Sequence, residues 1–185
     1  MTKDRFKEIT LDNWLEPDDV PLVDPVPISI QDEVITPLSP DEYVPEIMRP
    51  KLDKSVPAEV KEIFEIAQGA MIYGYFFHPL YTLASEQLGR AAEAAVANKC
   101  EALGAPKHRT TNFIQSIHWL ADSQIISFSD FVRWDQIHEF RNQSSDTTHL
   151  LITRPREAVI QLDYIAKMIN SLFPSSDDGK ADSPD

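Results

Sequence analysis

Hydrophobic residues recur at intervals of three and four over most of residues 58–174, which is the spacing of one face of an α-helix. Pro57 suits the start of a helix, so a first helix is expected from there to about Tyr73. Pro79 disfavours helical backbone at the residue before it, which predicts a break over Tyr73–Pro79. The apolar face of this first helix consists of Val60, Ile63, Phe64, Ala67, Ala70 and Met71.

The same spacing continues after the break. Gly104-Ala105-Pro106 ends the second helix, which is rich in alanine, and the weak helix formers Ser144–Thr148 end the fourth. Ser127 or Ser129 is expected to cap the fourth helix, and Thr153 to cap the fifth. No strand pattern competes, so this part is expected to be an all-α bundle. The further helices are expected over Leu80–Leu103, Thr111–Ser123, the segment between Ser129 and Ser144, and Pro155–Phe173.

Residues 1–57 form a different kind of segment, an irregular and Pro-rich N-terminal arm. Nine of the 14 prolines of the chain fall here, too many for a long helix or a central strand. Large apolar side chains are nevertheless dispersed through the arm, and disordered linkers normally lack them. Two interpretations follow: the arm lies extended on its own domain, or it orders only on a partner or a second subunit. Residues 58–174 form the helical domain, and residues 175–185 are expected to be a disordered acidic tail.

The formal net charge of −13 is concentrated outside the helical domain. The arm holds 13 Asp and Glu against 6 Lys and Arg, whereas residues 58–174 hold 13 against 10. Acidic flanks oppose non-specific binding to nucleic acid, whose affinity comes from basic side chains on phosphates. A local site within the nearly neutral domain remains compatible with this balance.

One cysteine, Cys100, excludes an internal disulfide and fits a reducing cytoplasm. Because it lies within a helical pattern, it is expected to be a buried thiol and not a nucleophile. No apolar run approaches the roughly 18 residues that span a bilayer. The charged N-terminus lacks the apolar stretch of a signal peptide. We therefore expect a cytoplasmic protein without a membrane segment.

Three features in this order resemble the HEPN family over about residues 58–173. They are the alanine-rich helix ending in residues 100–106, the segment Ile117–Ser127, and the segment Ile137–Asn142 leading to His149. The resemblance implies a HEPN-like bundle of four to five helices and a homodimer in which two motifs face each other. It also implies metal-independent cleavage of RNA by Arg141, Asn142 and His149, in proteins that often act in toxin–antitoxin or phage-defence systems.

The chemistry of these three residues suits this reaction. Arg141 offers a permanently charged fork of donors to phosphate oxygens, and His149 can act as base or acid near neutral pH. Asn142 can orient either group or the substrate. Seven residues separate Arg141 from His149, one more than the usual upper limit in the family. On one continuous helix the two would lie ~12 Å apart along the axis and ~80° off a common face. They can converge only if the helix breaks, or if they meet across a dimer axis.

Alternatives accompany this hypothesis. The chain could be a non-catalytic HEPN-like module that binds a protein or nucleotide. It could also be an unrelated helical bundle that binds a protein partner through its N-terminal arm. An Arg followed by an Asn also suits the end of a helix without any catalytic role. His138 is a candidate second proton carrier but fits a core-edge histidine better. Trp119 and Trp134 could stack on bases but are expected to be core. Neither a metal site nor a cofactor motif is indicated.

Overall fold

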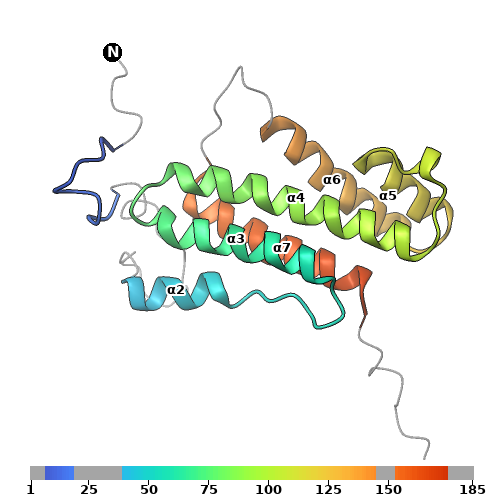
Figure 1. Cartoon of the computed structure of the whole chain (residues 1–185), viewed down its shortest axis with the longest axis horizontal. Coiled ribbons are helices and arrows are strands. Elements are labelled where there is room, and N and C mark those ends of the chain that lie inside the picture. Colours follow the sequence, from blue (N-terminus) through green and yellow to red (C-terminus); the bar gives the residue numbers. More distant parts are fainter. Residues whose placement is uncertain (1–6, 19–38, 145–152, 175–185) are drawn as a thin grey trace, which may run out of the picture.

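The computed structural model of the chain describes residues 7–18, 39–144 and 153–174. Within these residues it contains six α-helices, one short 3-10 helix and no strand, which confirms the all-α prediction (Figure 1). None of the described helices is long and apolar enough to cross a membrane. The α-helices are α2 (Pro40–Met48), α3 (Ala58–Gly74), α4 (Pro79–Ala102), α5 (Phe113–Asp122), α6 (Phe128–Ser144) and α7 (Pro155–Leu172).

Helix α4 is the centre of the bundle and contacts α3, α5, α6 and α7 (Figure 1). The expected break over residues 73–79 is present, so α3 and α4 form an antiparallel pair. Helix α7 runs alongside α4 in the same direction. Near one end the Thr153 N–H donates to Thr82 Oγ1 at 3.1 Å, and near the other Lys99 Nζ lies 5.5 Å from the centroid of the Phe173 ring.

Small side chains allow four helices to approach α4 closely. Alanine has no side chain beyond Cβ, so helices packed over it come near without clashes, and larger residues fill the space between them. The buried residues of α4 and the residues of α3, α5, α6 and α7 that face them form one hydrophobic core. The fully buried residues contributed by α4 are Tyr81, Ala84, Leu88, Ala91, Ala92, Ala95 and Val96.

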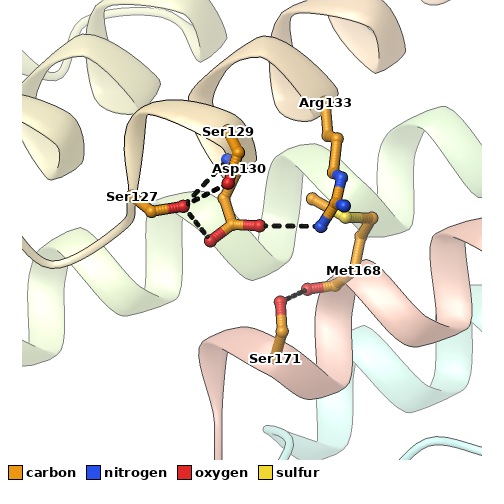
Figure 2. A network of polar contacts seen from close by, with 6 residues as sticks. All are labelled: Ser127, Ser129, Asp130, Arg133, Met168 and Ser171. Atoms are coloured by element: carbon orange, nitrogen blue, oxygen red, sulfur yellow. Dashed lines mark hydrogen bonds and ion pairs between the residues drawn. The ribbon is translucent and has the colours of Figure 1, made fainter.

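Gly104 and Ser127 act at helix ends as the sequence predicts. Gly104 has a φ of +69°, and its N–H donates to the Glu101 carbonyl at 2.9 Å, so it ends α4 as expected. Ser127 caps α6, because its Oγ accepts the Asp130 N–H at 3.1 Å; Figure 2 shows this turn. The prediction that Thr153 caps α7 is wrong. The N-cap of α7 is Arg154, and the Thr153 backbone is bonded to α4 instead.

Helix α2 was not predicted, because its nine residues include two prolines. Pro40 occupies the first turn, where no backbone N–H is needed, whereas Pro45 lies inside the helix and removes one hydrogen bond. Packing offsets this loss, since Tyr43 and Ile47 are buried against the core. Gln68 of α3 also donates to the carbonyl of Ile47 at 2.8 Å, just before the end of α2.

Candidate functional site

Arg141 lies in the last turns of α6, against the surface of α4. Its Nη2 is 2.7 Å from Glu93 Oε2, and both side chains are about one-third exposed. Its aliphatic part passes over Gly89, where a built Cβ would lie only 3.4 Å from Arg141 Cγ. The absence of a side chain at Gly89 therefore lets Arg141 lie flat on α4 and places its guanidinium beside Glu93.

The described residues include only part of the expected catalytic motif. Asn142 belongs to α6, but its side chain is not among those described. His149 lies outside the described residues, and α6 ends at Ser144, before it. Arg141 is thus the one member of this motif whose surroundings are defined, and the convergence of the motif stays a prediction.

Glu93 was not identified from the sequence as part of this site. It lies 48 positions before Arg141, and the alanine-rich pattern of α4 gives no sign that this glutamate differs from others on the helix surface. The pairing depends on how α6 crosses α4, which is a tertiary property. Glu93 is an acidic group that orients the candidate arginine.

His138, one turn before Arg141, is placed at the edge of the core. Its ring is 5.8 Å from the Phe113 ring in an edge-to-face arrangement, and its side chain is 20% exposed. Nδ1 lies 3.9 Å from Asp135 Oδ1, a long contact for a charged pair. The interpretation of His138 as a core-edge histidine agrees with this packing.

The expected core positions of the tryptophans are also found. Trp134 is fully buried, and Trp119 is partly buried against the core. The fully buried Trp134 offers no open aromatic face of the kind that stacks on bases. Among the described residues, no group of three His, Cys, Asp or Glu side chains could hold a metal ion.

A second polar cluster lies where residues 7–18 meet the bend between α3 and α4. Asp18 and His78 are each only 4% exposed, and Asp18 Oδ2 accepts the His78 N–H at 3.0 Å and contacts its Nδ1 at 3.1 Å. Beyond them the hydroxyls of Tyr43 and Tyr81 are hydrogen-bonded to each other, and Tyr43 donates to the Met71 carbonyl. Burial raises the pKa of both tyrosines above the ordinary value, which keeps them protonated.

This cluster fastens the arm to the helical domain. The Asp18 N–H donates to the Tyr75 carbonyl at 2.9 Å, so backbone and side chain of one arm residue are both held by the bend. This contact could not be predicted from the sequence, because Asp18 is one of 13 acidic residues in the arm. Asp18 is thus enclosed by the fold and holds the arm against the bend.

Cys100 is buried in α4, as expected, with Sγ 3.7 Å from the Ser116 carbonyl oxygen. Burial raises the pKa of its thiol, which lowers the fraction of reactive thiolate. We expect the folded protein to react with a thiol reagent such as 5,5′-dithiobis(2-nitrobenzoate) at least tenfold more slowly than the urea-unfolded protein. Equal rates would show that Cys100 is accessible in the folded chain.

Comparisons of the chain with models of protein families, with curated proteins and with solved structures find no match. The resemblance to the HEPN family therefore stays a prediction from the sequence.

Proposed function

We propose that the chain is a HEPN-like protein that cleaves RNA without a metal ion, at a composite site formed by Arg141, Asn142 and His149 of two subunits. The observation that supports this is the placement of Arg141. Gly89 and Glu93 fix its side chain on α4, and about a third of it is exposed at the end of α6. An arginine that is oriented in advance and accessible loses little entropy when it binds a phosphate.

In the proposed reaction a ribose 2′-hydroxyl attacks the adjacent phosphorus. His149 of one subunit accepts the proton of this hydroxyl, and His149 of the second subunit donates a proton to the leaving 5′-oxygen. The two Arg141 side chains stabilise the additional charge on the phosphate oxygens in the transition state. The products are a 2′,3′-cyclic phosphate and a free 5′-hydroxyl, and no metal or other reactant is consumed.

The test is incubation of the purified chain with end-labelled RNA in the presence of EDTA. We expect Arg141→Ala and His149→Ala each to lower the cleavage rate at least tenfold. Arg133→Ala is the matched control, because Arg133 is an exposed arginine of the same helix, paired with Asp130 at 3.1 Å. The cleavage rate of this variant should lie within about twofold of that of the unchanged chain, because an exposed ion pair contributes little free energy. Equal rates in all four samples would exclude this site.

A second candidate function is a non-catalytic HEPN-like module that binds a protein or nucleotide partner. Glu93 favours this non-catalytic function, because its carboxylate lies 2.7 Å from the Arg141 guanidinium and offsets the positive charge that would attract a phosphate. The C-terminal end of α6 adds partial negative charge nearby. In this case the unchanged chain would not cleave RNA. The Arg141–Glu93 pair would then contribute only stability, about 0.2–1 kcal/mol in a double-mutant cycle.

A further inference from the structure

Three large apolar side chains are exposed on the turn at residues 11–15. Leu11 is 93% exposed, Trp14 56% and Leu15 58%. They are separated by three and four positions, the spacing with which short peptide segments present anchors to an apolar groove. Exposure of single apolar residues is common, but three within five residues amount to a concentrated apolar surface.

This turn is held in shape by its own polar side chains. The Thr10 N–H donates to Asn13 Oδ1 at 2.8 Å, and the Asn13 N–H donates to Thr10 Oγ1 at 3.2 Å. The Asn13 amide also donates to the Glu8 carbonyl at 2.8 Å. These reciprocal bonds fix the backbone that carries Leu11 and Trp14, so little ordering entropy remains to be lost on binding.

The two ends of the turn are fastened to the helical domain. Lys7 Nζ donates to the Glu16 carbonyl at 2.5 Å and lies 3.4 Å from the Phe76 carbonyl. On the other side, Asp18 is buried and bonded to Tyr75 and His78. The bundle therefore presents the apolar residues outward on a fixed base, although burying them on its own surface would lower the free energy of the isolated chain.

The charges around the turn identify the chemistry of its partner. Glu8, Asp12 and Glu16 flank the apolar residues, so a complementary surface has an apolar groove bordered by basic side chains. A second copy of this chain would bring a net charge of −13 against the same acidic flanks. Anionic lipid headgroups would likewise repel them. We infer that Leu11, Trp14 and Leu15 dock into an apolar groove, bordered by Lys and Arg, of a different protein. This inference does not depend on the proposed cleavage of RNA.

The test begins with the full chain carrying Leu11→p-benzoylphenylalanine, irradiated in the cells that produce it. The matched control carries the same photoreactive group at Ile160, which is 59% exposed on α7. The protein captured through position 11, and not through position 160, is then purified and titrated with the unchanged chain. We expect the double variant Leu11→Ser with Trp14→Ser to weaken this binding at least tenfold, and Ile160→Ser to leave it within about twofold. Binding should also weaken as salt is raised.

Each other outcome would overturn the inference. The first is that position 11 captures no protein that position 160 does not also capture. The second is that position 11 crosslinks only two copies of the chain. The third is that the double variant binds the captured protein with unchanged affinity. Vesicles of phosphatidylcholine with phosphatidylglycerol provide a further arm, and binding to them that is lost with Trp14→Ser would assign the turn to a membrane surface. Circular dichroism should be the same for all variants, because the substituted side chains are exposed.

Discussion

Trp134→Ala is expected to lower the free energy of unfolding by about 3–5 kcal/mol, the range for truncating a buried aromatic residue. Trp134 is fully buried in α6, and its ring meets that of Phe113 edge-on, with centroids 6.4 Å apart. Removing the indole would leave a cavity between α5 and α6, which α4 and its packed helices prevent from collapsing. Urea unfolding followed by circular dichroism measures the change.

Two controls separate packing from other effects of this substitution. Trp14→Ala removes the same side chain at an exposed position and should change stability by less than about 1 kcal/mol. Trp134→Phe keeps an aromatic ring and removes the indole N–H, which has no hydrogen-bond partner among the described residues, so it should cost clearly less than Trp134→Ala. A similar loss for Trp14→Ala and Trp134→Ala would contradict the packing of α6 against the core.

Gly74→Ala and Gly69→Ala, both on α3, are expected to change stability in opposite directions. A Cβ at Gly74 would lie 2.8–3.0 Å from three ring atoms of Tyr81. That ring cannot move aside easily, because it is fully buried and its hydroxyl is bonded to Tyr43. We expect Gly74→Ala to destabilise the chain by about 1–3 kcal/mol through overpacking at the α3–α4 contact.

Gly69 has no atom within 4 Å of its built Cβ, so an alanine there meets open space. Alanine is favoured over glycine inside a helix, and Gly69→Ala should stabilise the chain by about 0.5–1 kcal/mol. Thermal unfolding of the two variants, side by side with the unchanged chain, measures both signs. A loss of stability for Gly69→Ala, or none for Gly74→Ala, would show that α3 and α4 do not pack as described.

The helices of residues 58–174 could be predicted because their signals are local. Periodic apolar residues, Pro57, Pro79 and Gly104 act on the backbone within a few positions of themselves, whatever the rest of the fold. Helix α2 could not be predicted in this way. Its own sequence opposes a helix at Pro45, and the burial of Tyr43 and Ile47 against distant residues decides the outcome.

The same distinction applies to the candidate site. Arg141 and Asn142 stand in a short motif that the sequence displays directly. The partner of Arg141 is remote in the sequence, because Glu93 reaches it only through the crossing of α4 and α6. In the second polar cluster, Asp18 likewise reaches His78 across 60 positions. Such pairings depend on the tertiary arrangement of the helices, and one sequence contains no periodic signal for them.

The composite site is tested by mixing the unchanged chain with an inactive one. The unchanged chain and the His149→Ala protein are combined in equal amounts, allowed to exchange subunits, and assayed for cleavage of labelled RNA in EDTA beside the same mixture before exchange. Because the proposed reaction needs His149 of both subunits, a mixed dimer is inactive, and random exchange should lower the cleavage rate to about half. A rate that exchange leaves unchanged, beside an active unchanged chain, would contradict a site shared across the dimer. An unchanged chain that leaves the RNA intact would contradict the ribonuclease itself.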